Sequence, residues 1–527
     1  MSSTRAYVGS VAALLMLLFA IPSFAQSFRV QCPPTTTLHP TALQPGAGEP
    51  AYTGPSNTGQ NSAPTGVVNG AIKCQQISGG DGYATMGDGT QTYLFAFGPL
   101  SGISDILRGL PGTEFASTFN TVGDPRTDPA YNGAVGLVPD PESSPPGQLD
   151  GHVDPRPIMD VGVMNGNIPA PTMGIDEDDE FFLTLTNVGM IMRPDLFEQH
   201  TVHFHGYPNA SAFYDGVPDA SVAINIGGSF TYYYLAPDAG TYFWHCHITP
   251  PEHLQMGMVG QIFVRPRQNR VPYGASLYNA LLQQQNDLRT KCGNDILCST
   301  PLPQSNGMLH ARNRSGSPTL YAYNDGDGST AYDVEYPLQI HGFDPNFHFV
   351  GMTFNPEPFT DMKDKYFLLN GRSYPDTLNT AAPGTAGSMQ TPVADGTTHF
   401  SQPLPALINI PAGGRALLRI SDLDVSEYQT LASLGIPMHV IAINARLLRD
   451  MAGNDMTYYT NSITLGGGES LDLLLDASDT TKYAPGQIFY LYTPNLDHLS
   501  NDAENFGGLM TEIHICRAVD PATKACS

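Results

Sequence analysis

Short apolar runs separated by glycine and proline recur along the chain and predict β-strands. Residues 181–187 alternate apolar and polar side chains, and residues 232–235 form a shorter aromatic run. Helical periodicity is rare, and residues 278–289 carry the best example. Short strands that alternate with Gly/Pro turns are typical of β-sandwiches, and the chain holds 54 glycines and 45 prolines. The fold is therefore predicted to be all-β.

Changes in composition divide the 527 residues into segments, and a chain of this length favours two or three domains. A polar, proline-rich insertion at 123–157 has the character of a long surface loop. In chain order we expect an irregular Pro/Gly/Thr-rich arm (26–70), a first β domain (71–266), a linker (267–315), a second β domain (316–518) and a tail (519–527).

The first 25 residues have the pattern of a secretory signal. Arg5 supplies the positive start, residues 11–20 the apolar region, and Ser23-Phe24-Ala25 a small-residue cleavage site before Gln26. The apolar run is too short to span a bilayer, and no later stretch reaches 18 apolar residues. We expect a protein exported to the periplasm or the extracellular space, without a membrane span.

Seven cysteines suit an oxidising compartment. Six of them can form three disulfides, although sequence does not give the connectivity. They flank the arm, close a short loop in the linker and bracket the tail: Cys32 and Cys74, Cys292 and Cys298, Cys516 and Cys526. Cys246 is the odd one, and its place between two histidines indicates a metal ligand.

The formal charge is −25, and loss of Arg5 with the signal makes it −26. Binding to phosphate backbones needs clustered Lys and Arg, so this balance argues against nucleic acid. An acidic surface can concentrate cationic substrates such as metal ions, or it can serve only the solubility of a secreted protein.

Two short segments hold most of the candidate metal ligands. Residues 200–205 read His-x-x-His-x-His, and residues 245–247 read His-Cys-His. Alternate residues of a strand share a face, so the histidines of each H-x-H pair point together. Side by side, the two strands predict an all-imidazole face of His203, His205, His245 and His247, with His200 and Cys246 converging behind it.

A thiolate with two imidazoles and a weak axial methionine is the ligand set of a blue-copper electron-transfer site. His253 and Met258, in the loop after Cys246, complete that set. Four imidazoles on the other face suit copper that reacts with oxygen. Because Cys246 is bonded through the backbone to a histidine on each side, electrons have a short covalent path between the two sites. A lone histidine is usually an ordinary hydrogen-bonded residue, but the joint pattern favours copper.

The pattern resembles the multicopper oxidases, which include laccases and metal oxidases. Their signature contains H-x-x-H-x-H and H-C-H-x3-H-x4-M; here the second motif has five residues before His253, because Pro250-Pro251 is added. We expect this addition to alter the reduction potential or substrate access. The resemblance implies two cupredoxin-like Greek-key β-sandwich domains with long loops. It assigns type 1 copper to His200, Cys246, His253 and Met258, type 2 copper to His203, and the type 3 pair to His205, His245 and His247.

Two acids are candidates for proton delivery. Residues 214–218 are similar to the family's M-D-G-V-P segment, whose aspartate lies beside type 2 copper, and this singles out Asp215. The alternative is an ordinary Asp-Gly turn. Glu252, which precedes His253, is the second candidate, as an acid near the cluster.

The second predicted domain lacks half of the family's cluster. Residues 367–375, 468–475 and 505–513 resemble cupredoxin domains without copper. A complete trinuclear cluster in the family uses four H-x-H pairs; this chain supplies two, and its later histidines form none. Two copies facing each other would restore the count through a two-fold contact. Alternatively, another protein supplies the missing half, or the chain holds blue copper with a simpler type 2 site.

The resemblance implies an oxidase that takes electrons from a small reductant at type 1 copper and reduces O2 to water at a type 2/type 3 cluster. The count of H-x-H pairs favours a cluster that is shared between chains. The reductant is a phenol or a metal ion such as Mn(II), Fe(II) or Cu(I), and the acidic surface favours metal ions. One alternative is a blue-copper electron carrier or copper-storage protein. Another is an enzyme like the copper nitrite reductases, against which His203 and His247 argue.

Overall fold

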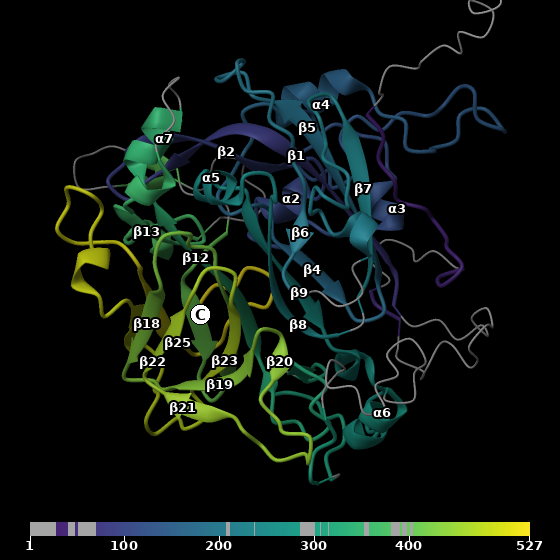
Figure 1. Cartoon of the computed structure of the whole chain (residues 1–527). Coiled ribbons are helices and arrows are strands. Elements are labelled where there is room, and N and C mark those ends of the chain that lie inside the picture. Colours follow the sequence, from purple (N-terminus) through teal and green to yellow (C-terminus); the bar gives the residue numbers. More distant parts are fainter. Residues whose placement is uncertain are drawn as a thin grey trace, which may run out of the picture.

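The computed structural model describes residues 28–40, 48–50, 70–206, 211–236, 238–284, 301–305, 307–314, 316–351, 358–380, 390–392, 398–400 and 404–527 (Figure 1). The predicted secretory signal and the pair Cys292 and Cys298 lie outside these residues. Within them the chain is mostly β, which confirms the predicted fold class. We call the part that carries β1–β9 the first half and the part that carries β10–β25 the second half. No sheet in the described ranges takes strands from both halves.

The first half is built from two sheets. One has the order β2-β1-β5-β7 with β3 at the side of β1, and the other has the order β4-β9-β8-β6. Aromatic and aliphatic side chains such as Phe97, Leu183 and Trp244 fill the core between them. The strands are β1 (Ile72–Thr85), β2 (Gln91–Pro99), β3 (Glu114–Phe115), β4 (Met173–Asp176), β5 (Glu180–Gly189), β6 (His203–Phe204), β7 (Ser229–Leu235), β8 (Gly240–His245) and β9 (Val259–Arg265).

The second half repeats this two-sheet plan. One sheet has the order β13-β12-β17-β23-β19-β20 with β21 beside β19, the other β16-β25-β24-β18-β22, and two small ribbons pair β10 with β11 and β14 with β15. The strands are β10 (Leu320–Tyr321), β11 (Ala331–Tyr332), β12 (Val334–Phe343), β13 (Tyr366–Leu369), β14 (Gln390–Pro392), β15 (Thr398–Phe400), β16 (Ile408–Pro411), β17 (Arg415–Asp422), β18 (Gln429–Leu434), β19 (Met438–Ile443), β20 (Arg446–Leu447), β21 (Tyr458–Thr460), β22 (Ser462–Leu465), β23 (Ser470–Asp476), β24 (Ile488–Tyr492) and β25 (Met510–Cys516).

Helices are short and lie in the connections. The predicted helix at 278–289 is α6, which is described up to residue 284. In the described part of the chain, no helix combines the length and the apolar character needed to cross a membrane. The α-helices are α2 (Ile103–Ile106), α3 (Ala116–Phe119), α4 (Pro155–Gly162), α5 (Pro250–Gln255), α6 (Leu277–Gln284) and α7 (Pro345–Gly351), and the 3-10 helices are η1 (Ala212–Tyr214), η2 (Arg267–Arg270), η3 (Phe359–Asp361), η4 (Asp376–Leu378) and η5 (Leu496–His498).

Two of the anticipated cysteine pairs are disulfides. Cys32–Cys74 ties the described arm residues to β1, and Cys516–Cys526 closes the tail. The described arm residues belong to none of the named helices or strands, and Val30 is buried in the core beside α3. Cys246 is a buried free thiol, which keeps it available as a ligand.

The strand β8 joins the halves, because it packs against β17 and β23 of the second half. Thr241 Oγ1 donates to the buried carboxylate of Asp472 at 2.6 Å, and Ser470 Oγ donates to the carbonyl of Thr241 at 2.6 Å. Such contacts fix the strand from which the candidate ligands project.

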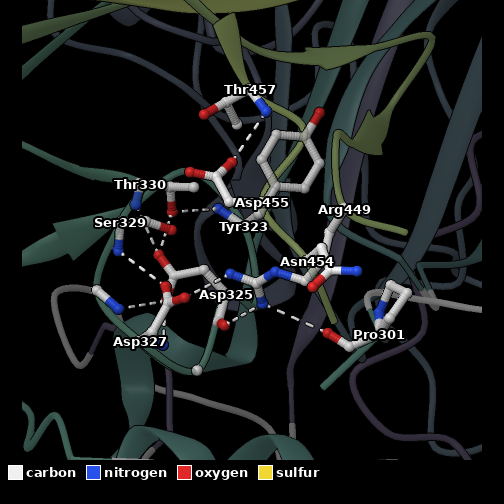
Figure 2. Close-up of polar contacts among 12 residues, drawn as sticks. Pro301, Tyr323, Asp325, Asp327, Ser329, Thr330, Arg449, Asn454, Asp455 and Thr457 are labelled. Carbon is white, nitrogen blue, oxygen red and sulfur yellow. Dashed lines mark hydrogen bonds and ion pairs between the residues drawn. The ribbon is translucent and has the colours of Figure 1, made fainter. Parts of the chain in front are cut away.

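Figure 2 shows the loop at 325–330, whose two aspartates, Asp325 and Asp327, lie beside Arg449. Asp325 accepts hydrogen bonds from the N–H groups of Gly328 and Thr330, both at 2.8 Å, and Arg449 pairs with Asp327 at 2.7 Å. Gln268, which follows β9, donates to Asp325 at 2.6 Å. Protein donors thus bind the carboxylates of Asp325 and Asp327, so the role of this loop is to hold neighbouring segments together.

Candidate metal centre

The pairing of β6 with β8 sets the positions of the candidate ligands. His203 lies opposite His245 and Phe204 opposite Trp244 in this antiparallel pair. His200 precedes β6, where its backbone exchanges hydrogen bonds with Ile224. The positions of these residues agree with the alternation of side chains expected for strands, although β6 is only two residues long.

One group of side chains, the cysteine group, consists of His200, Cys246 and His253. Their ligand atoms lie within 4.8 Å of one another, and all three residues are buried. His253 Nδ1 is 3.3 Å from Cys246 Sγ. α5 positions His253, and its first turn is formed by Pro250-Pro251, the two residues added to the loop.

Met258 is buried beside the cysteine group. Its backbone N–H donates to the carbonyl of His253 at 2.8 Å, and its carbonyl accepts from the N–H of Cys246 at 3.1 Å. A Cβ built at Gly79 would lie 2.7 Å from the His200 ring and 3.5 Å from Met258 Cε. Met258 and His200 therefore meet at one glycine of β1.

His200 is the side chain of this group whose surroundings best fit a metal ligand. Its side chain is 0% exposed, and neither ring nitrogen has a hydrogen-bond partner among the described residues. Buried polar groups in proteins are almost always hydrogen-bonded, because an unpaired one costs about 1–3 kcal/mol. A metal ion between His200, Cys246 and His253 removes that cost, so the side chains fit copper.

Two of the three side chains have protonation states that suit a metal. Burial alone would raise the pKa of the Cys246 thiol, but the charge and hydrogen bond of His253 outweigh it and lower this pKa. Burial and the nearby His253 hold the pKa of His200 well below its usual range. A thiolate and a neutral imidazole are the forms that ligate metals. Burial would lower the pKa of His253, but Cys246 and Glu198 raise it to about 9, so a metal ion must displace a proton from this ring.

A second group, the histidine group, consists of His203, His205, His245 and His247. The ligand atoms of the first three lie within 4.8 Å of one another, and the Nε2 atoms of His205 and His245 are 2.8 Å apart. The His247 ring centroid is 5.0 Å from that of His203. The structure thus brings the four predicted imidazoles together.

Hydrogen bonds orient these rings. His203 Nδ1 donates to the carbonyl of Asp215 at 2.7 Å, and His245 Nδ1 donates to the carbonyl of Cys246 at 2.5 Å. Each bond fixes the tautomer and leaves Nε2 as the ligand atom. Burial, with the neighbouring His203, lowers the pKa of His205 to about 4, which keeps this ring neutral.

A cleft of about 610 Å³ opens beside the histidine group, between the two halves. The first half contributes His205, Phe243 and α5, and the second half contributes residues 424–428 and 466–469. Gly468 has a φ of +91°, and a Cβ there would lie 2.8 Å from His205 Nδ1. Glycine at this position allows the second half to approach the ring.

The two candidate acids lie in different surroundings. Asp215 Oδ1 is 3.5 Å from His203 Nδ1, so this acid adjoins the histidine group. Burial raises the pKa of Glu252. The charge of His253 lowers this pKa, and the charge of Glu198 raises it. Glu252 therefore belongs to the surroundings of the cysteine group.

Sequence reasoning missed Glu198. Its carboxylate lies 3.5 Å from His253 Nε2, and its side chain is 25% exposed, whereas His253 is fully buried. Glu198 therefore links the cysteine group to solvent. The available signal was its position, two residues before His200.

The described histidines of the second half are engaged elsewhere. His498 bonds to Gln429 and Asn495, His439 stacks on Tyr459, and His341 donates to the carbonyl of Leu254. No group of potential metal ligands in the described ranges combines a second-half histidine with the histidine group. The side chain of His399 is outside the described residues.

The sequence model of a family described as Multicopper oxidase matches residues 151–269, the segment that holds all the predicted ligands. The chain is 34% identical over 109 residues to Laccase abr2 of Aspergillus fumigatus, which is 20% of this chain and 17% of that protein. It is 23% identical over 370 residues to Multicopper oxidase elcG of Phaeosphaeria nodorum, covering 66% of this chain and 53% of that protein.

Among solved structures, the chain is similar to a blue copper oxidase from Nitrosomonas europaea, with a TM-score of 0.47, 16% identity and coverage of 84% and 85% of the two chains. The matches to the fungal relatives span only about a sixth to a half of their length. The family model covers residues 151–269, so this segment is similar to a multicopper oxidase domain.

Proposed function

We propose that this protein is a copper-dependent oxidase that takes single electrons from a small reductant at the cysteine group and reduces O2 to water at the histidine group. The observation that carries the proposal is the pair of unpartnered, fully buried ring nitrogens of His200 beside the Cys246 thiolate. Copper held by these residues would supply one-electron redox chemistry and the binding of oxygen. His200, Cys246, His253 and Met258 would hold one ion, and the histidine group would hold the others.

The side chains around the groups have distinct tasks in this proposal. Glu198 connects His253 to solvent and attracts a cationic reductant to the edge of the cysteine group. Cys246 joins that group to His245 and His247 through two peptide units. The backbone carbonyl of Asp215 fixes the His203 ring, and its carboxylate lies 3.5 Å from that ring, where it would relay protons. Glu252, an acid that burial favours in its neutral form, is a second proton source.

The reductant is a metal ion such as Mn(II), Fe(II) or Cu(I), or a phenol. A net charge of −25 and the exposed part of Glu198 favour cations. The protein works after export, in the periplasm or the extracellular space. That location agrees with the two disulfides of the described chain.

The oxygen-reducing cluster is completed by assembly, either of two copies of this chain or with a partner subunit. Four imidazoles are half of the family's set, and in the described ranges the second half adds none. His203, His205 and His247 are partly exposed, so their face is accessible to a second copy. Copper that binds well only to the assembled form stabilises that form by mass action.

Copper content measured together with mass by light scattering, before and after chelation, tests the proposal. We expect more than two copper ions per chain in an oligomer, loss of the oligomer on chelation, and oxygen uptake with Fe(II) or a phenol. One copper per chain in a monomer without oxygen uptake would support an electron carrier instead. Turnover of nitrite in place of oxygen would support a nitrite reductase-like enzyme.

A further inference from the structure

A row of aromatic side chains leads from the cysteine group to the surface along β1 and β2, which lie side by side in Figure 1. In their register Tyr83 lies opposite Tyr93, and Asp81 lies opposite Phe95. Alternate residues of a strand share a face, so Tyr93 and Phe95 point to the same side of the sheet. The Phe95 ring contacts the His253 ring with centroids 5.1 Å apart.

The outer end of the row reaches solvent. The rings of Tyr93 and Tyr83 meet edge to face with centroids 6.1 Å apart. Tyr93 is 1% exposed and Tyr83 is 40% exposed. Residues two apart on a strand are separated by about 7 Å. The row therefore runs in short steps from exposed Tyr83, through Tyr93 and Phe95, to His253.

The Tyr93 hydroxyl has a base in place. It donates to Asp81 Oδ1 at 2.6 Å, and Asp81 Oδ2 accepts from the N–H of Met192 at 2.7 Å. The distance is that of a charge-assisted hydrogen bond. Burial and Asp81 raise the pKa of Tyr93, so the phenol keeps its proton until an electron leaves. A phenol that loses an electron becomes a strong acid, and Asp81 is positioned to receive that proton.

The hydrogen bond alone is not unusual, since buried tyrosines normally find a partner. Tyr233 donates to Glu180 at 2.8 Å in the same half of the molecule. Its ring contacts Phe182 and Tyr214, and no contact of the described structure joins it to His253. The difference is the position of Tyr93 between an exposed ring and the cysteine group.

We propose that Tyr83 and Tyr93 form an electron relay that allows phenols bound at the surface to reduce the cysteine group without touching it. The inference rests on the proposed function and adds a separate entry point for aromatic reductants. His253, Cys246 and Met258 are buried, so a phenol cannot reach them directly. Glu198 offers a carboxylate to cations, whereas Tyr83 offers an aromatic ring to phenols.

Each electron transfer is coupled to the transfer of one proton. Tyr93 would give one electron to an oxidised copper ion held by the cysteine group and its hydroxyl proton to Asp81. The phenol at Tyr83 then returns one electron to Tyr93 through Tyr83 and releases its own proton to water, while Asp81 returns the first proton. The phenol leaves oxidised by one electron, and the relay is restored.

Flash photolysis of the copper-free protein with tris(bipyridine)ruthenium(III) as the oxidant tests the relay without any oxidase activity. The wild type should form a long-lived tyrosyl radical, seen by transient absorption and EPR. Tyr93→Phe should lose this radical, and Asp81→Asn should slow its formation by about 10²-fold, the contribution of a positioned base. Tyr233→Phe is the matched control and should behave as the wild type.

With copper bound, bleaching of the blue colour by a phenol should slow in Tyr93→Phe and in the surface variant Tyr83→Leu, while bleaching by Fe(II) stays unchanged. Equal radicals in wild type and Tyr93→Phe, or equal losses in Tyr93→Phe and Tyr233→Phe, would overturn the relay. A wild type without copper or oxygen uptake would defeat the proposed function instead, and the copper-free radical experiment distinguishes the two failures.

Discussion

His498 of the second half and His200 of the first half differ in what their ring nitrogens contact. In the second half, His498 donates to Gln429, accepts from Asn495 and stacks on Phe367 with ring centroids 3.7 Å apart. In the first half, His200 is equally buried, yet its nitrogens face Cys246 and His253 without a hydrogen bond. The first arrangement stabilises the fold by itself, and the second requires a ligand. Residue type and burial are alike, so the partners distinguish a structural histidine from a metal ligand.

The largest effect is expected from Cys246→Ser. A hydroxyl cannot replace the thiolate, so the intense visible absorption and the oxidation of every reductant should disappear, while circular dichroism shows that the β fold remains. Absorption spectra with copper analysis provide the measurement. Retention of the blue band would remove Cys246 from the ligand set.

Asp215→Ala should slow oxygen reduction by about 10²-fold or more, because a positioned acid typically contributes that much to proton transfer. Reduction of the cysteine group by a phenol or Fe(II) should change far less. Stopped-flow measurement of the two half-reactions separates the effects. If both slow equally, Asp215 is only the turn residue that orients His203.

A pair of leucine substitutions tests the comparison of the histidines on copper-free protein. His498→Leu removes two hydrogen bonds and a ring stack, and should lower the free energy of unfolding by about 2 kcal/mol. His200→Leu removes an unpartnered imidazole and should leave that free energy unchanged or higher, but should abolish copper binding.

Urea denaturation of both variants and copper titration provide the measurements. A His200→Leu protein that is destabilised as much as His498→Leu would mean that His200 serves the fold in the same way as the second-half histidines. Copper binding by His498→Leu should match the wild type, since its ring does not contact either ligand group.

Met258→Leu should have the smallest effect. Leucine conserves the volume, so the cost in stability should remain below about 1.5 kcal/mol. The blue colour should persist and the reduction potential should rise, because a weak axial ligand lowers it. A spectroelectrochemical titration that gives an unchanged potential would show that Met258 packs beside the site without acting as a ligand.

Patterns of neighbouring residues in the sequence predicted the candidate ligands better than they predicted contacts between distant segments. The alternation of side chains on a strand sufficed to separate His200 and Cys246 from His203 and His245, because that rule needs only a few consecutive residues. The oxidising compartment predicted disulfides, whereas their pairing, Cys32 with Cys74 and Cys516 with Cys526, came from the structure.

Contacts between distant segments were not predictable. The role of Glu198 depends on a loop that returns to α5, and the cleft beside His205 depends on Gly468 of the other half. Pro250-Pro251 was expected to alter the reduction potential or substrate access, and the sequence did not indicate that it starts the helix that presents His253. Glu252 was expected near the cluster, but its surroundings depend on how that helix packs.

The strand β8 carries a candidate ligand and also binds the second half. One end carries His245, and the other carries Thr241, whose hydroxyl hydrogen-bonds to buried Asp472 of the second half. A recombination event that joined this first half to a foreign second half would leave Thr241 and Asp472 without matching partners and would loosen the strand that holds the ligands. The two halves are therefore expected to pass through evolution as one block, even though only one of them contains the ligand motifs.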